Sequence, residues 1–355
     1  MEKFKLNLQL FAGTIVNATT AYVNSETGAT TPFAGANSLS PGMKTFYQTK
    51  LLVNSREKHF FTQFGRKEPL PANHGRTIEF RKLNTLPMAT ELQEGVLPEA
   101  TKFGETALVG ALKQHGMFLA FSDLLDLHHV DPILSGAVEE LGASQGQTKD
   151  ILCRNVLQTN TNVMFADTET EADGVVTYTT PTNYSGMKLD NNRLTPRMVH
   201  KVVTWMKKCN VPMIDGSYVA IIHPSVSFDL TEHKQWKDLH TYTDAVDQVF
   251  EGEIGKLFGV RFVETNNAKI TEQTVGGSKG NVYSSVFLGK DAFATIDPEG
   301  GGMEMIIKSK KEIGGPLEQY STAGYKFEDA TIILYPERMV IVESCSEYSD
   351  VDEPN

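Results

Sequence analysis

The sequence predicts an α+β protein built around a mixed sheet, and three patterns indicate this fold class. A long stretch of helical periodicity covers residues 131–160. Residues 218–223 form a short, continuous apolar run between Gly216 and Pro224, which is typical of a buried central strand. Further strand-like runs in the second half alternate with short helical stretches. This mixture predicts helices packed on a sheet that has both parallel and antiparallel neighbours.

Composition excludes several classes of protein. The 355 residues are enough for a sizeable core, and 40% hydrophobic with 22% charged residues is close to globular averages. The net charge of −11 argues against a protein that grips nucleic acid over its whole surface. No apolar run approaches the roughly 20 residues of a membrane span, and the N-terminus lacks a secretory apolar block. We therefore expect no membrane association and no export.

The three cysteines predict free thiols. Cys153, Cys209 and Cys345 lie far apart in the chain and have no metal-binding spacing. Such a pattern is typical of a reducing cytoplasm, where disulfides are rare. We expect neither disulfides nor a bound metal.

The N-terminal 64 residues predict an arm. Residues 1–12 alternate apolar and polar positions, which is a strand pattern. Residues 13–40 are rich in Thr, Ala, Asn, Gly and Ser and are too poor in large apolar residues to build a core. Residues 41–64 favour a helix with a break near Asn54. Because an arm with apolar residues needs a partner surface, we expect these positions of the first strand to contact another subunit: Leu6, Leu8, Leu10 and Phe11.

Residues 76–82 and 106–121 are two extended stretches that we expect to pair as a hairpin. The polar excursion between them, residues 84–104, is longer than the roughly 12 to 15 residues usual for loops in compact proteins. Such loops are functional or disordered, so the sequence favours a projecting hairpin with contacts on another subunit; a plain flexible loop is the alternative. The charged candidates for these contacts are Glu91, Glu94, Glu99 and Lys102.

Residues 131–160 predict one long helix. Asp131 can cap its first amides and Pro132 suits its first turn. At 1.5 Å per residue the helix would be roughly 45 Å long, which indicates a strut. We expect its packed stripe to consist of Leu134, Val138, Leu141, Thr148, Leu152 and Val156.

The polar stretch 167–192, with Val175, Val176 and Tyr178 as its only strand-like run, predicts a domain boundary near Asn191. Thr195 and Pro196 then begin a helix. We expect its buried face to be Met198, Val199, Val202, Val203 and Met206. The further strands expected are 260–264, 282–288, 303–308, 325–335 and 339–342, and the further helical pieces are 225–230 and 244–250.

No active site can be recognised. The densest group of chemically active side chains is His223, His233, His240, Asp229, Glu232, Asp238 and Asp244. Its spacing matches no metalloenzyme motif, and the sequence has no nucleophile elbow for a catalytic triad. The glycine runs at 276–280 and 300–302 lack the elements of a phosphate cradle. We expect no catalytic, metal or cofactor residues; a cytosolic hydrolase that uses the histidine group is the alternative from another class.

The chain resembles the major capsid proteins of tailed bacteriophages, which share the Hong Kong 97-type (Johnson) fold. It looks most like the podovirus N4-like branch of that family. The likeness follows the chain in order, and its segments are residues 5–12, 252–255, 259–264, 289–293, 325–327 and 339–343. None of these segments is catalytic, which agrees with a structural protein and not an enzyme.

The resemblance implies a role for each part of the chain. Residues 1–66 would be the N-terminal arm with its helix, and residues 67–122 the extended loop over a neighbouring subunit. Residues 123–191 and 336–348 would form the peripheral domain with its spine helix. Residues 192–335 would be the axial domain, and residues 349–355 an acidic tail.

The resemblance also implies partners and a location. The chain would form hexamers and pentamers in the icosahedral capsid of a virion, around double-stranded DNA that it does not bind sequence-specifically. A separate scaffolding protein, a portal protein and a decoration or cement protein would be its partners, with assembly in the host cytoplasm. Two features differ from some relatives: we find no long helical N-terminal extension and no position that matches their crosslinking lysine and asparagine. An encapsulin-like compartment shell is the same-fold alternative.

Overall fold

A computed structural model shows the chain as two compact units. The described residues are 21–23, 30–32, 59–71, 76–83, 86, 88–89, 91, 104–122, 133–172, 175–234, 236, 253–298, 303–313, 319–348 and 352–355. Residues 59–113, 148–299 and 329–355 belong to the larger unit. Residues 114–147 and 300–328 belong to the smaller unit, together with the described residues among the first 58.

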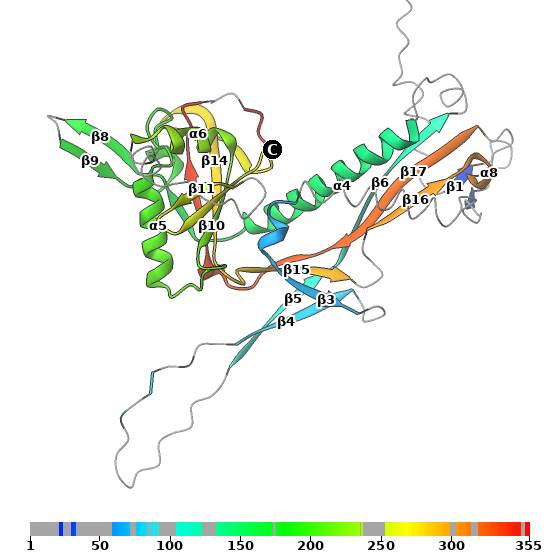
Figure 1. Cartoon of the computed structure of the whole chain (residues 1–355), viewed down its shortest axis with the longest axis horizontal. Coiled ribbons are helices and arrows are strands. Elements are labelled where there is room, and N and C mark those ends of the chain that lie inside the picture. Colours follow the sequence, from blue (N-terminus) through cyan, green and yellow to red (C-terminus); the bar gives the residue numbers. More distant parts are fainter. Residues whose placement is uncertain are drawn as a thin grey trace, which may run out of the picture. The chain divides into compact units, whose positions relative to one another are not determined.

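A seven-stranded mixed sheet forms the centre of the larger unit (Figure 1). Its strand order is β11-β12-β10-β14-β19-β7, and β13 also pairs with β14. The pairs β10–β12 and β19–β7 are parallel, and the others are antiparallel, so the predicted α+β class with a mixed sheet is confirmed. The strands are β7 (Val163–Phe165), β10 (Tyr218–Ile222), β11 (Glu253–Leu257), β12 (Val260–Glu264), β13 (Lys269–Val275), β14 (Ser278–Leu288) and β19 (Met339–Ser344).

Local sequence patterns explain why this sheet forms its core where it does. All five residues of β10 are buried, as their continuous apolar run predicts. Helix α5 (Pro196–Lys208) begins at Thr195, whose side chain accepts a hydrogen bond from the Met198 amide. The predicted apolar face of α5 is buried, and it packs with β10, β12 and β14 in one cluster. Helix α6 (Pro224–Glu232) follows β10 and confirms the helical piece expected there.

The predicted strut is helix α4 (Ile133–Leu157), but its packed face differs from the expected stripe. The expected cap and first-turn residues, 131–132, lie outside the described residues. Val138 and Leu141 are buried as predicted. Thr148, Leu152 and Val156 are only half-buried, so the second half of the stripe was wrong. The buried face there runs instead through these residues: Gln145, Asp150, Cys153, Arg154 and Leu157.

A second group of strands in the larger unit carries the predicted hairpin. Strand β4 (Thr77–Leu83) pairs antiparallel with β5 (Glu105–Ala111), which confirms the pairing. The stretch 106–121 is two strands and not one, because the chain breaks at Leu112, whose amide donates to the Arg76 carbonyl. A three-stranded sheet of order β18-β15-β3 belongs to the same unit. Its strands are β3 (Arg66–Leu70), β15 (Phe293–Pro298) and β18 (Thr331–Ile333).

The smaller unit contains a three-stranded sheet of order β16-β17-β6. Its strands are β6 (Lys113–Ser122), β16 (Glu304–Lys308) and β17 (Tyr320–Asp329). The expected single strand 325–335 is therefore two strands, β17 and β18, which belong to different sheets. The unit also holds α8 (Lys310–Ile313) and the antiparallel pair β1 (Ala21–Val23) and β2 (Thr30–Pro32), which lies in the predicted arm.

The hairpin of β8 (Thr168–Ala172) and β9 (Val175–Thr179) lies in the polar stretch where only one strand-like run was expected. Short 3₁₀ turns occur at Thr62–Phe64, Tyr184–Gly186 and Pro336–Arg338. The first strand of the predicted arm, residues 41–58 of the predicted helix 41–64 and the predicted piece 244–250 lie outside the described residues. The described end of that predicted helix is a 3₁₀ turn at Thr62–Phe64. The domain boundaries stay predictions.

Candidate functional site

The β4–β5 ribbon is the first candidate interaction surface, because it contributes few residues to its own core. Of the seven residues of β5, only Gly110 is buried, and Val109 is 68% exposed. A Cβ atom at Gly110 would meet Ile332 Cδ1 at 2.0 Å, so the glycine permits close contact between the ribbon and strand β18. The ribbon is thus packed at its base and exposed beyond it.

An ion pair holds the other end of the ribbon, where β4 leads into residues 84–104. Lys82 Nζ donates to Glu337 Oε1 at 2.9 Å, and the same ammonium lies 4.7 Å from the centre of the Tyr335 ring. Burial acts to raise the pKa of Glu337, but the hydrogen bond and positive charge of Lys82 outweigh it and lower the pKa. Glu337 therefore stays ionised, and the ribbon is tied to the turn before β19.

A groove of about 360 Å³ lies between β3, β4 and residues 334–335. Leu70, Ile78 and Phe80 line it together with Leu334, and charged side chains such as Arg81 also reach it. The lining is therefore mixed, with charged and apolar side chains next to each other. The groove is therefore a second candidate contact surface on the β4–β5 ribbon.

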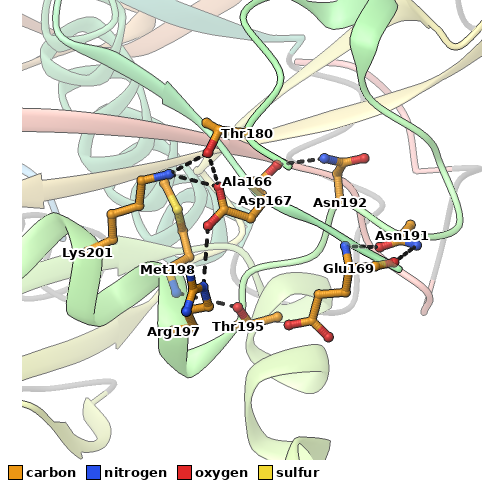
Figure 2. Close-up of polar contacts among 10 residues, drawn as sticks. All are labelled: Ala166, Asp167, Glu169, Thr180, Asn191, Asn192, Thr195, Arg197, Met198 and Lys201. Carbon is orange, nitrogen blue, oxygen red and sulfur yellow. Dashed lines mark hydrogen bonds and ion pairs between the residues drawn. The ribbon is translucent and has the colours of Figure 1, made fainter. Parts of the chain in front are cut away.

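The β8–β9 hairpin is held by a polar anchor, which Figure 2 shows. Asp167 is 4% exposed, and its Oδ1 accepts from Thr180 Oγ1 at 2.6 Å and from Lys201 Nζ at 2.8 Å. Arg197 Nε lies 3.8 Å from Asp167 Oδ2. Burial acts to raise the pKa of Asp167, but the lysine, threonine and arginine outweigh it and lower the pKa. A charged carboxylate therefore joins the hairpin to α5.

Two asparagines complete this anchor. The Glu169 amide donates to Asn191 Oδ1 at 2.7 Å, and Asn191 Nδ2 donates to the Glu169 carbonyl at 2.5 Å. Asn192 Nδ2 donates to the Ala166 carbonyl at 2.6 Å (Figure 2). These side chains replace backbone partners that a turn would otherwise lack. Because the base is fixed in this way, the hairpin presents Val176 and Tyr178 as half-exposed side chains.

A buried carboxylate on α4 clamps the start of the larger unit. Asp150 Oδ1 accepts from the amides of Phe60 at 2.9 Å and Phe61 at 2.7 Å, and Oδ2 accepts from Asn267 Nδ2 at 3.1 Å. Burial raises the pKa of Asp150 to about 6 despite these hydrogen bonds. The neighbouring Arg154, 2% exposed, donates to the Asn267 carbonyl and to Asn355 Oδ1, both at 2.8 Å.

Of the contact residues predicted from sequence, only Glu91 lies in the described part of the chain. It is exposed in the excursion between β4 and β5. The remaining predicted contacts, Leu6, Leu8, Leu10, Phe11, Glu94, Glu99 and Lys102, lie outside the described residues. Sequence reasoning missed Asp150, Asp167 and the two asparagines, whose partners lie far away in the chain. A lone acid at the end of an apolar run, as at Asp167, was the available signal.

The histidine group has structural roles. His223 accepts from the Ser225 amide at 3.2 Å and caps α6, and Asp229 accepts from the Glu347 amide. Asp238, His240 and Asp244 lie outside the described residues. Among the residues that the structure describes, no group of three or more His, Cys, Asp or Glu is placed to hold a metal ion. The three cysteines are free thiols, and no described helix is long and apolar enough to cross a membrane.

No protein-family model matches the chain, and no curated protein is similar to it in sequence. Solved structures do match. A chain in the capsid of Ralstonia phage GP4 has a TM-score of 0.60 at 12% identity, over 84% of this chain and 93% of that chain. A chain in the capsid of cyanophage P-SCSP1u has a TM-score of 0.57 at 12% identity, over 81% and 89%.

The protein has a phage capsid fold. A chain in the mature capsid of bacteriophage PhiM1 agrees, with a TM-score of 0.55 at 11% identity over 80% of this chain and 86% of that chain. The Hong Kong 97-type fold predicted from the sequence is therefore confirmed. The matches support the capsid fold in general and do not distinguish the N4-like branch.

Proposed function

We propose that this chain is the major capsid protein of a tailed bacteriophage. It assembles as hexamers and pentamers into an icosahedral shell that encloses double-stranded DNA. The observation that carries the proposal is the capsid fold, which extends over about four fifths of this chain and most of each matching capsid chain.

The exposed ribbon supports the same function from within the molecule. A capsid subunit needs several modest interfaces, and each must stay exposed until a neighbour covers it. The β4–β5 ribbon, with its groove, is a surface of this kind. We assign the neighbour contacts of the arm to Leu6, Leu8, Leu10 and Phe11, and those of the excursion to Glu91, Glu94, Glu99 and Lys102.

The finer proposals follow from the sequence resemblance. They are membership of the N4-like branch, the division into arm, extended loop, peripheral and axial domains, and assembly in the host cytoplasm. A scaffolding protein, a portal protein and a decoration protein are the proposed partners. Each of these is a proposal about this chain, supported by its likeness to the family.

Electron micrographs of the purified protein test the function. The expected result is closed shells, sheets or rings, formed alone or with a scaffolding protein. Sedimentation that shows a stable monomer at high concentration under both conditions would contradict it. Shells that contain a protein cargo and never DNA would favour the encapsulin-like alternative.

Deleting residues 84–104 and joining β4 to β5 by a short turn tests the assigned contacts. We expect a folded subunit that cannot close a shell, because these residues lie between the two strands of a ribbon with little core of its own. An unfolded variant would show that the excursion belongs to the subunit core.

A further inference from the structure

The outward face of α5 carries a row of cations on a chain whose net charge is −11. Arg197, Lys201, Thr204 and Lys208 are spaced by four, three and four residues, so they lie along one ridge of the helix. This ridge is opposite the buried face of Met198, Val202 and Met206. Pro196–Lys208 contains no Asp or Glu, and His200 and Lys207 are exposed beside the row.

Contacts hold the first half of the row in place. The Arg197 guanidinium lies 3.8 Å from the centre of the Tyr178 ring, which is a cation–π contact. Lys201 donates a hydrogen bond to Asp167, as Figure 2 shows. The His200 ring lies 5.0 Å from that of Phe258. A single buried acid, Asp167, is therefore shared by two cations.

The second half of the row is not neutralised within the described part of the chain. Lys207 and Lys208 are exposed in the last turn of α5, and neither makes an ion pair with a described residue. A positive surface thus remains on a chain that is acidic as a whole. Such a local surface attracts a polyanion, whereas the remaining surface repels one.

We propose that this cationic face of α5, made of Arg197, His200, Lys201, Thr204, Lys207 and Lys208, contacts the phosphate backbone of packaged double-stranded DNA. The inference rests on the proposed function. Arg197 and Lys208 are eleven residues apart, or about 16 Å along the helix, a length over which duplex DNA presents several phosphates.

The row favours a nucleic acid over a protein partner. Protein interfaces centre on apolar or aromatic anchors seated in pockets. Here the exposed rings of Tyr178 and Phe258 lie against Arg197 and His200. The second half of the row, with Lys207 and Lys208, has no such ring contact among the described residues. Exposed lysines of this kind bind phosphates without reading base sequence. Few contacts per subunit give weak binding, which allows DNA to enter and leave the shell.

A binding assay with the full-length, unassembled subunit and a short DNA duplex tests the proposal. The variant Lys207→Gln/Lys208→Gln should flatten the plot of log affinity against log salt by about 1.8, since each lost phosphate contact contributes about 0.9. Between about 50 and about 200 mM salt, the affinity of the unmodified protein should fall roughly 12-fold more than that of the variant.

The matched control is Lys279→Gln/Lys290→Gln, which removes two exposed lysines outside α5. It should leave both affinity and slope unchanged. An equal loss in both variants would show that binding follows net charge alone, and absent duplex binding at low salt would also overturn the proposal. A variant that binds DNA normally but blocks shell closure would assign the face to a protein neighbour.

Lysine labelling in particles provides the second measurement. A small amine-acylating reagent should modify Lys207 and Lys208 less in DNA-filled shells than in empty ones, with Lys279 and Lys290 as internal references. Equal modification in filled and empty shells would exclude the DNA contact. Because shell formation is observed separately, that result would leave the capsid function standing.

Discussion

The seven-stranded sheet and the β4–β5 ribbon differ in how much of their surface is buried within the subunit. In β10 every residue is buried, whereas in β5 only Gly110 is. The Phe262 ring of β12 packs between the rings of Trp236 and Phe287 in the core of the larger unit. Val109 of the ribbon is instead 68% exposed. The difference indicates that the sheet supplies more of the stability of the subunit than the ribbon does, and it leaves the ribbon surface exposed for the neighbour contacts that we propose.

The largest expected effect is in the sheet. Phe262→Ala should lower the free energy of unfolding by about 3 to 5 kcal/mol, because it removes a fully buried ring and leaves a cavity. Urea unfolding of the unassembled subunit measures the change.

The matched variant in the ribbon is Val109→Ala, which should change the free energy of unfolding by less than about 0.5 kcal/mol. Comparable losses in the two variants would show that the ribbon is part of the stabilising core, and the contrast between the two regions would fail.

The pH dependence of stability should also come from the buried region. Asp150 has a pKa of about 6 in the folded chain, against 3.8 as its ordinary value. Between about pH 4 and 6 the folded state therefore binds more protons than the unfolded state, so the free energy of unfolding falls as pH rises through this window. The shift corresponds to roughly 2 to 3 kcal/mol.

Asp150→Asn tests this point. Asparagine keeps an oxygen for the Phe60 and Phe61 amides but cannot ionise. The loss of stability between pH 4 and pH 7 should be smaller in the variant by about 2 to 3 kcal/mol. Burial also raises the pKa values of Asp229 and Glu343, so a residual slope of the same sign should remain. An unchanged pH profile would mean that Asp150 does not titrate there.

A smaller effect is expected where the ribbon meets the sheet β18-β15-β3. Gly110→Ala should destabilise the subunit by about 1 to 3 kcal/mol, because its new Cβ meets the end of the Ile332 side chain. Ile332→Ala should relieve that clash, so a double-mutant cycle of unfolding free energies should give a favourable coupling. Additive losses would show that the close approach at Gly110 is unimportant.

Sequence alone predicted elements whose pattern is local. The face of α5 and the burial of β10 follow from spacing within 13 and 5 residues, and both were confirmed. The resemblance supplied the capsid fold, which composition and periodicity could not reach. Strand β3, with the sequence Arg-Lys-Glu-Pro-Leu, has no alternation and forms only through its parallel pairing with the distant β15.

The sequence did not predict the polar residues of the candidate sites, because their partners are also distant in the chain. Asp150 and Arg154 are charged residues outside the predicted apolar stripe of α4, so helical periodicity predicts that they face solvent. They are buried because Asn267, more than a hundred residues later, supplies partners to both. No local signal carries that information. The second half of the α4 stripe therefore had to be corrected, whereas Val138 and Leu141 in its first half were predicted correctly. The side chain of Leu134 lies outside the described part of the chain.

A small effect on folding, and the largest separation between folding and assembly, is expected at Lys82. Lys82→Met keeps most of the apolar stem but removes the ion pair with Glu337 and the contact with the Tyr335 ring. A partly exposed pair of this kind contributes less than about 1 kcal/mol, so urea unfolding should hardly change. The matched control is Arg81→Met, since Arg81 is 67% exposed and lies 3.7 Å from Glu79 and 3.8 Å from Glu105.

Assembly should nevertheless distinguish the two variants. Lys82 is the sixth of the seven residues of β4 and lies at the end that leads into residues 84–104, so loss of its ion pair should free the part of the ribbon nearest the proposed contacts. Lys82 ties that end of the ribbon to the turn before β19, whereas the carboxylates near Arg81 belong to the ribbon itself. Shell formation followed by light scattering should therefore slow in Lys82→Met and stay normal in Arg81→Met. The pKa of Glu337 is lowered, so the pair should persist at its ordinary value of 4.5 and be lost only on further acidification, which should slow the unmodified protein toward the rate of Lys82→Met. Equal assembly rates for both variants would show that the ribbon is oriented by its neighbour and not by its ion pair with Glu337.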